Sequence, residues 1–151
     1  MDLKPVIIKY ADKYKLPANI IYGICMQESG MNQYAVRYEP NYKYLFMPEK
    51  TKPKTCSTNT EIILQKISFG LGQIMGAVLR ERGYKDWLTK ILNSPDEQID
   101  YMCKHLSIYY KKYNNINDMI SSYNQGSPRK TNSKYNNQYY VDKVLEYSKQ
   151  F

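Results

Sequence analysis

Apolar residues recur with the period of an α-helix along most of this chain, and this pattern restricts the fold more than any other feature. The first stripe consists of Val6, Ile7, Tyr10, Ala11 and Tyr14. Further helical stretches follow over residues 17–28, 58–83, 84–92, 94–113 and from about 137 onwards. No internal repeat or linker interrupts the 151 residues, so we expect a mainly α fold in a single domain over residues 1–151.

Capping residues mark several of the helix starts. The segment 94–97 combines a serine N-cap, a proline at the first helical position and a capping-box glutamate. Thr58 and Glu61 have the spacing of another capping box, and Asn117 is placed to cap a short helix. From Ser68 we expect a further helix that continues to Gly83.

The helical period disappears between Gly30 and about Asn59, where the chain is rich in tyrosine, proline and lysine. Thirty irregular residues inside a compact domain usually belong to a functional loop or to a small β element. We therefore expect a long irregular or small-β region over residues 31–59 that takes part in a functional site.

The formal net charge of +8 attracts polyanions such as nucleic acid, anionic lipid or the anionic polymers of a bacterial cell wall. No pattern typical of an RNA-binding domain, a zinc finger or a basic zipper is present, so we expect no nucleic-acid partner. Lys50, Lys52 and Lys54 cluster in the irregular segment. They either steer the protein toward an anionic polymer or serve as a solvated basic surface.

Cysteine and histidine usage argues against a metal centre or a cofactor. Cys25, Cys56 and Cys103 have no metal-binding spacing, and His105 is the only histidine. Cys25 and Cys103 fall on apolar helix faces, where buried free thiols are the favoured interpretation, although one disulfide bridge stays open. His105 lies beside the apolar stripe of its helix, and we expect it to be partly exposed and not catalytic.

Glu28 occupies an unusual position on the second helix. At about 100° per residue, Ile24 lies about 40° to one side of it and Ile21 about 20° to the other. Glu28 is therefore on the face that becomes buried, near the negative end of the helix dipole, and both effects raise the pKa of a carboxyl group. A raised pKa suits a general acid that protonates a leaving oxygen near neutral pH. A glutamate that turns out to solvent or pairs with a lysine is the alternative.

The residues around Glu28 resemble a known family when they are read with later segments. Four segments occur in order, namely Glu28-Ser29-Gly30, Gly70-Leu71-Gly72-Gln73, Ser122-Tyr123-Asn124-Gln125-Gly126 and Tyr140-Val141-Asp142-Lys143-Val144. They are similar to the E-S, G-L-M-Q, A-Y-N-A-G and Y-V-x-x-V patterns of the soluble lytic transglycosylase (SLT) domain, a family related to goose-type lysozyme. The resemblance runs from about Pro17 to Leu145. The stretches 37–40 (RYEP) and 127–129 look like a subgroup common in phages and their hosts.

The resemblance implies a role for each matching residue. Glu28 would be the sole catalytic acid and base, and Ser29 would support its geometry. Gln73 would bind the sugar N-acetyl or peptide groups. Tyr123 and Asn124 would line the cleft, with the Tyr123 hydroxyl able to hold Glu28 or the reacting sugar. Tyr140 would pack under or beside this site.

The sequence departs from the family pattern at a few positions. Gly72 replaces the usual methionine and removes a side chain that normally borders the cleft, whereas Ser122 and Gln125 replace small alanines. These departures leave Glu28, Gln73 and the Tyr123-Asn124 pair intact. We therefore expect them to affect subsite preference and not the activity itself.

The activity implied by the resemblance is cleavage of the β-1,4 bond between N-acetylmuramic acid and N-acetylglucosamine, with closure of a 1,6-anhydro ring on the muramic acid. One carboxylate suffices because the nucleophile belongs to the substrate. A hydrolytic muramidase would need a second carboxylate, for which Glu39 is the candidate unless it pairs with Arg37 or a backbone amide. A non-catalytic wall-binding protein on the same fold is a further alternative.

Peptidoglycan strands are thus the expected partners of a protein we expect to be monomeric, and anionic wall polymers are a further candidate partner. The apolar run of residues 1–9 is too short for a signal peptide, and no segment approaches the roughly 20 apolar residues of a membrane span. We expect the protein to act on the cell wall, reached through export, release or delivery by a phage.

Overall fold

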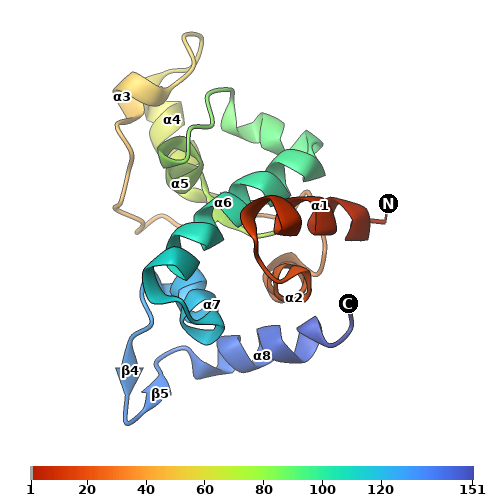
Figure 1. Ribbon diagram of the computed structural model, residues 1–151. Helices are drawn as coiled ribbons and strands as arrows, with labels where there is room; N and C mark the ends of the chain where they lie inside the picture. The colour runs from red at the N-terminus through yellow and green to blue at the C-terminus, as the bar shows by residue number, and fades with distance from the viewer. Residues whose placement is uncertain (1) are drawn as a thin grey trace.

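The longest helix, α6 (Pro95–Tyr113), runs through the middle of the molecule between two groups of elements (Figure 1). The computed structural model describes residues 2–151 and confirms the mainly α fold. The other helices are α1 (Lys4–Tyr14), α2 (Ala18–Ser29), α3 (Pro48–Thr51), α4 (Thr58–Gln65), α5 (Gly76–Glu81), the 3₁₀ helix η1 (Leu88–Asn93), α7 (Ile116–Gln125) and α8 (Gln138–Ser148). The strands are β1 (Val36–Tyr38), β2 (Ile67–Phe69), β3 (Ile74–Met75), β4 (Lys130–Thr131) and β5 (Lys134–Tyr135).

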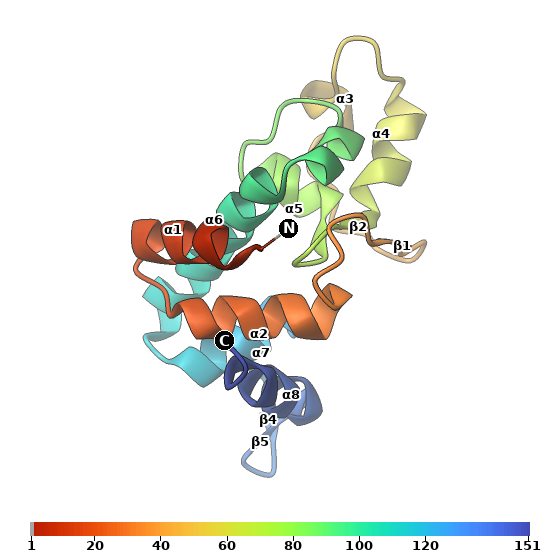
Figure 2. The ribbon, with the colours of Figure 1, turned by 90° about the vertical axis from the view of Figure 1, so that its right-hand side faces the viewer.

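Each group of elements has its own hydrophobic core. Helices α1, α2, α7 and α8 pack with α6 around fully buried side chains that include Ile21 and Ile24 of α2. A smaller core lies under the sheet and includes Phe69 of β2, Leu79 of α5 and Leu88 of η1. In Figure 2, α2 lies between α1 and α8, and the sheet and α3–α5 extend away from these helices.

The irregular region contributes strand β1 to a small β-sheet, as expected, and also contains the short helix α3. Strand β1 pairs antiparallel with β2, with Val36 opposite Phe69, and β2 pairs antiparallel with β3. The sheet order is therefore β1-β2-β3, with β1 at an edge. This pairing brings the start of the irregular region beside residues that lie about thirty positions later in the chain.

The structure corrects four helix starts. The helix expected over residues 84–92 is the 3₁₀ helix η1, which begins only at Leu88. Ser57, and not Thr58, caps α4 by accepting a hydrogen bond from the Thr60 amide, and Glu61 forms a buried ion pair in place of a capping-box contact. Asn115, and not Asn117, caps α7 through the Asp118 amide. Residues 67–75 form the β2–β3 hairpin, so the helix expected from Ser68 begins only at Gly76. The N-cap at Ser94 is confirmed.

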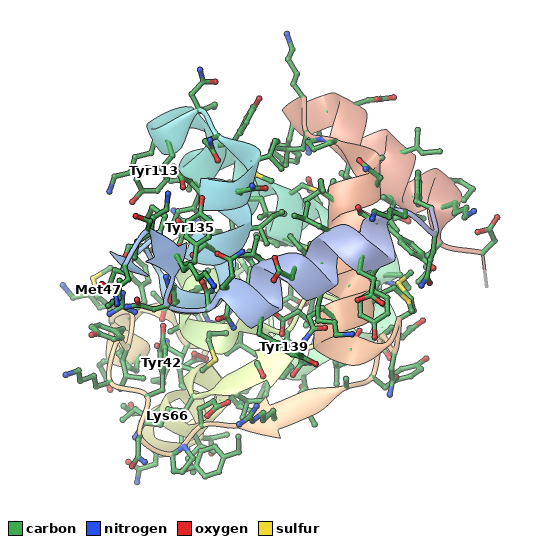
Figure 3. The ribbon with its side chains drawn as sticks, turned by 90° about the horizontal axis from the view of Figure 1, so that it is seen from below. Tyr42, Met47, Lys66, Tyr113, Tyr135 and Tyr139 are labelled. Carbon is green, nitrogen blue, oxygen red and sulfur yellow. The ribbon has the colours of Figure 1, made fainter. Side chains whose placement is uncertain are left out.

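Helices α2 and α8 approach each other closely at Gly23. A Cβ atom added there would lie 2.4 Å from the carbonyl oxygen of Val144, so only glycine permits this contact. Figure 3, which shows the molecule from below, shows α8 crossing α2, with the exposed Tyr139 near the start of α8. This contact positions the N-terminal half of α8 against the end of α2.

We expect Gly23→Ala to lower the free energy of unfolding by roughly 1–3 kcal/mol, since the methyl group meets backbone that cannot move without displacing α8. Urea denaturation measures this change. Gly30→Ala is the comparison, because its Cβ meets nothing within 4 Å and its left-handed φ alone costs about 1–2 kcal/mol. A Gly23→Ala variant as stable as the wild type would show that the helices separate freely at this point.

All three cysteines are buried and free, which answers the question that the sequence left open. Within residues 2–151, no helix is long and apolar enough to cross a membrane, and no group of three potential metal ligands comes together.

Candidate active site

A cleft with a volume of about 280 Å³ lies where the two groups of elements meet. Its wall is built from residues of α2, the β1–β3 sheet, α5, α6 and α7. The residues that line it are Glu28, Arg37, Glu39, Ser68, Gln73, Ile74, Met75, Val78, His105, Tyr123 and Asn124. Of the predicted site residues, Glu28, Glu39, Gln73, Tyr123 and Asn124 therefore share one cavity, although they are far apart in sequence.

Glu28 lies in the last turn of α2, half-buried, with its carboxyl group in the cleft. The Tyr140 hydroxyl donates a hydrogen bond to Glu28 Oε1 at 2.7 Å. Burial raises the pKa of Glu28 to about 7, and the Tyr140 hydrogen bond and the positive charge of Arg37 oppose that rise. A carboxyl group with this pKa is partly protonated at neutral pH, so it can give a proton and later accept one.

Tyr140 and Ser29 support Glu28 from outside the cleft wall. Tyr140 is buried on α8 and lies beside Glu28. Ser29 Oγ lies 3.1 Å from the Cys25 carbonyl oxygen of its own helix and 2.8 Å from that of Leu71, within hydrogen-bond distance of both. Ser29 thus links the end of α2 to the turn between β2 and β3 by a hydrogen bond.

Gln73 lines the cleft, but its amide group is occupied within the protein. Its Nε2 donates to the carbonyl oxygens of Ala35 and Gly70 at 3.0 and 2.9 Å, and its Oε1 accepts from the Ser68 hydroxyl at 2.9 Å. Both amide hydrogens are used, so only the second lone pair of Oε1 stays free for a ligand. In the structure, Gln73 holds the turn at the cleft wall.

Tyr123 lines the cleft without contacting Glu28 through a hydrogen bond. Its hydroxyl donates to the Gly72 carbonyl oxygen at 2.5 Å, so the hydroxyl that holds Glu28 belongs to Tyr140. Asn124 is exposed at the cleft, and its Oδ1 accepts a hydrogen bond from Asn137 at 2.9 Å. The Asn124 amide nitrogen has no such partner within residues 2–151 and is available to a ligand.

The surroundings of Gly72 leave no room for a side chain at this position. A Cβ atom at Gly72 would lie 2.7 Å from the Tyr123 hydroxyl and 2.8 Å from Met102 Sδ. Met102, a buried residue of α6, therefore occupies the volume next to the turn. Side chains of α6 and α7 thus fill the space next to Gly72, so the departure at this position leaves no empty space behind this part of the cleft wall.

We expect Gly72→Ala to lower the free energy of unfolding by roughly 1–3 kcal/mol through overpacking, and Met102→Ala to lower it by about 2–5 kcal/mol through a cavity. Because both changes act on one volume, the double variant should be more stable than the sum of the two losses by about 1 kcal/mol or more. A double-mutant cycle by urea denaturation measures this coupling. Strict additivity would mean that Met102 does not fill the space at Gly72.

Glu39 is engaged by Arg37. The Arg37 Nε lies 2.9 Å from Glu39 Oε1, and both side chains line the cleft. This is the ion pair that the sequence offered as the alternative to a second catalytic carboxylate. The ion pair keeps the positive charge of Arg37 near Glu28. It also places the carboxylate of Glu39, which can only accept hydrogen bonds, at the cleft wall.

His105 lines the cleft, which the periodicity of its helix did not reveal. Arg82 Nε donates to His105 Nδ1 at 3.3 Å, while burial and the Arg82 charge lower the pKa of His105 to about 4. The imidazole is therefore neutral at pH 7 with its proton on Nε2, where it can donate a hydrogen bond. Arg82 follows α5 and lies twenty-three positions from His105, so no local pattern marks the pair.

A mainly α fold with a cleft between two packed regions is the lysozyme-like architecture. The profile of the family described as Transglycosylase SLT domain matches residues 5–145. The chain therefore belongs to this family, whose members are generally peptidoglycan lytic transglycosylases. Searches of the curated proteins and of the solved structures found no match.

Proposed function

We propose that this protein is a peptidoglycan lytic transglycosylase in which Glu28 is the catalytic acid and base. The observation that carries the proposal is the carboxyl group of Glu28, held by Tyr140 in the cleft with a pKa of about 7. Membership in the SLT domain family supplies the substrate class, the glycan strands of peptidoglycan. The match over residues 5–145 supports one catalytic domain for the chain.

The proposed reaction uses Glu28 twice. In the first step, the protonated carboxyl group gives its proton to the glycosidic oxygen between N-acetylmuramic acid and N-acetylglucosamine. The bond between this oxygen and C1 of the muramic acid then breaks. The C6 hydroxyl oxygen of the muramic acid then bonds to C1, and the Glu28 carboxylate takes the hydroxyl proton. The products are one strand that ends in 1,6-anhydromuramic acid and one strand that begins with N-acetylglucosamine, which keeps the protonated oxygen as a hydroxyl group, and Glu28 is again protonated. The internal nucleophile makes a second carboxylate unnecessary.

The cleft offers several contacts to a bound strand. His105 and Asn124 present hydrogen-bond donors, and Ile74, Met75 and Val78 contribute apolar surface. Ser29, Gln73 and Tyr123 act mainly by holding the backbone that shapes the cleft, as their hydrogen bonds indicate. In this proposal Tyr140 orients Glu28 and stabilises its carboxylate form.

Hydrolysis with Glu39 as the second carboxylate is the other candidate, because Glu39 also lines the cleft. Mass spectrometry of purified peptidoglycan digested by the protein separates the two reactions. A 1,6-anhydro product has the mass of the hydrolytic product minus one water. We expect anhydro products from the wild type and from Glu39→Gln. Reducing-end products that vanish in Glu39→Gln would replace the proposal with hydrolysis, and unchanged glycan with retained wall binding would replace it with a binding role.

We expect Tyr140→Phe to move the alkaline limb of the pH–activity profile upward by roughly one pH unit. The Tyr140 hydrogen bond lowers the pKa of Glu28, so its loss raises that pKa, and the acid form needed for the first step persists to higher pH. Rates of glycan cleavage between pH 5 and 9 test this. Tyr123→Phe is the control, because the Tyr123 hydroxyl donates to the Gly72 carbonyl oxygen and not to Glu28. The alkaline limb of the pH–activity profile of this variant should stay in place. Equal shifts in both variants would contradict the assignment.

The expected site of action is the bacterial cell wall, and a phage or a bacterial origin agrees equally with this activity. The RYEP stretch at residues 37–40, which suggested the phage and host subgroup, contributes the Arg37–Glu39 ion pair to the cleft.

A further inference from the structure

A second pocket, with a volume of about 330 Å³, lies across α5 from the cleft. Val78 of α5 lines the cleft and Arg80 lines this second pocket. Residues two apart on a helix point to opposite sides, about 200° from each other, which separates the two cavities. Figure 1 shows α3 and the loop that follows α5 on the part of the molecule remote from α8. The second pocket is therefore a distinct site from the candidate active site.

The side chains around this pocket are basic. Lys50, Lys52 and Lys85 line it together with Thr51, Arg80, Gly83 and Tyr84, and no acidic side chain does. Lys50 and Lys85 are exposed and form no ion pair within residues 2–151. Lys52 Nζ donates to the Cys56 carbonyl oxygen at 2.9 Å, which leaves two of its three hydrogens free.

The carboxylates near these lysines in sequence are engaged elsewhere. Glu49 accepts a hydrogen bond from the Thr58 hydroxyl, Asp86 pairs with Lys90 at 2.8 Å, and Glu61 pairs with Arg80. The charge of Arg80 is thus balanced by Glu61 and that of Asp86 by Lys90, whereas the Thr58 hydroxyl leaves the charge of Glu49 in place. Glu49 offsets at most one of the three lysine charges, so the pocket keeps a net positive charge that an anionic ligand would neutralise.

One buried network holds both walls of the pocket. Arg80 donates from Nη1 to the carbonyl oxygens of Tyr84 and Asp86 at 2.8 and 2.7 Å, which fixes the loop after α5. Gln65 exchanges hydrogen bonds with the backbone of Phe46, which precedes α3, and its Nε2 lies 3.3 Å from the hydroxyl oxygen of Thr51, the last residue of α3. These contacts hold α3 at both of its ends.

Glu61 joins these two anchors. Its Oε2 accepts from both Gln65 Nε2 at 3.2 Å and Arg80 Nε at 3.0 Å. All three side chains are buried. The backbone that carries the lysines is therefore held in place before a ligand arrives, which lowers the ordering cost of binding.

We propose that this pocket, formed by Lys50, Lys52 and Lys85 over the Arg80–Glu61–Gln65 network, binds a phosphate group of an anionic polyol-phosphate polymer of the cell wall. The planar fork of Arg80, which would suit either a phosphate or a carboxylate, is occupied by Glu61, so the lysine ammonium groups are the donors left for a ligand, and separate ammonium groups can each contact one oxygen of a tetrahedral phosphate. The choice of a wall polymer as the phosphate source rests on the proposed function. Binding there would hold the active-site cleft near glycan strands.

Phosphate binding is tested first with inorganic phosphate. Amide ¹H–¹⁵N spectra are recorded during titration at constant ionic strength in chloride, with acetate as the second anion. We expect saturable shifts at residues 50–52 and 83–85 with phosphate and weak shifts with acetate. Lys50→Gln/Lys85→Gln should bind phosphate about tenfold more weakly, the loss expected for two exposed charged contacts. Lys134→Gln/Lys149→Gln removes the same charge from other exposed sites and should change the affinity less than about twofold.

The polymer is tested on cell walls in a Glu28→Gln background, so that the glycan stays intact. Walls that carry the polyol-phosphate polymer should retain the Lys50→Gln/Lys85→Gln protein less than the control double variant, and walls stripped of the polymer should retain both equally. A normal phosphate affinity of Lys50→Gln/Lys85→Gln, equal shifts with acetate, or tighter binding to duplex DNA than to the polymer would each overturn the proposal. A failure of glycan cleavage would leave these binding measurements unchanged, so the two proposals fail separately.

Discussion

Glu28→Gln is expected to reduce the rate of peptidoglycan cleavage by roughly 10³-fold, within the range that general acid–base catalysis contributes. Glutamine keeps the size of the side chain and still accepts the Tyr140 hydrogen bond, but it neither gives a proton to the glycosidic oxygen nor takes one from the C6 hydroxyl. Release of soluble muropeptides from purified walls measures the rate. Glu39→Gln is the matched control, since it changes the other glutamate of the cleft in the same way.

The outcome of this pair of variants separates the candidate functions. A large loss in Glu28→Gln with anhydro products retained in Glu39→Gln agrees with a transglycosylase that uses one carboxylate. Comparable losses in both variants would point to a two-carboxylate hydrolase. Cleavage by Glu28→Gln at the wild-type rate would remove Glu28 from the mechanism altogether.

Glu28→Gln also has a pH-dependent effect on the stability of the protein. Burial raises the pKa of Glu28 from 4.5 to about 7 in the folded protein, so the folded state holds this proton more tightly than the unfolded state does. The stability that this proton contributes is fully present below about pH 4.5 and is lost as the pH rises through about 7. Glutamine does not titrate, so the stability of Glu28→Gln relative to the wild type should increase by up to about 3 kcal/mol between these pH values. Urea denaturation at pH 4.5 and pH 8 measures this difference.

The second large effect is expected at the buried ion pair between Glu61 and Arg80. Arg80 Nη2 lies 2.7 Å from Glu61 Oε1 and Nε lies 3.0 Å from Oε2, with both side chains almost fully buried. Glu61→Leu leaves the guanidinium without its counter-charge, and we expect it to lower the free energy of unfolding by about 3–5 kcal/mol. Urea denaturation at pH 7 tests this value.

A double variant provides the control for this prediction. Glu61→Leu/Arg80→Met removes both charges, so it should recover a substantial part of the lost stability, because no buried charge is left without a partner. The carbonyl oxygens of Tyr84 and Asp86 then lose their donor, so recovery should be incomplete. A double variant less stable than Glu61→Leu would show that Arg80 matters mainly through these carbonyl contacts and not through Glu61.

Helix positions were largely predictable because the apolar period is a local property of the chain. The stripe of Val6, Ile7 and Tyr10 and the N-cap at Ser94 correspond to α1 and α6 in the structure. The hairpin of β2 and β3 was not predicted, since its strands are short and are defined by their pairing with β1. Its turn also places Gly70 and Gln73 at positive φ, and a glutamine gives no signal for that conformation.

Glu61 shows why local patterns fail at buried polar residues. Its spacing from Thr58 is that of a capping box, yet its partner Arg80 lies nineteen positions later on α5. The Glu61–Arg80 ion pair neutralises the charge of Glu61, which the capping-box interpretation would leave exposed at the helix surface. A pattern within four residues carries no information about such a partner, because the contact exists only after α4 and α5 pack together.

The sequence by itself determined the mainly α class, the burial of the helix face that carries Glu28, and the order of segments that marks the SLT domain family. Only the tertiary structure decided that Tyr140, 112 positions away, holds the Glu28 carboxyl group. It likewise decided that Met102 fills the space beside Gly72 and that His105 faces the cleft. The physical reason is that burial and helical period follow from neighbours in the chain, whereas the partner of a buried polar group is chosen by the packing of distant helices.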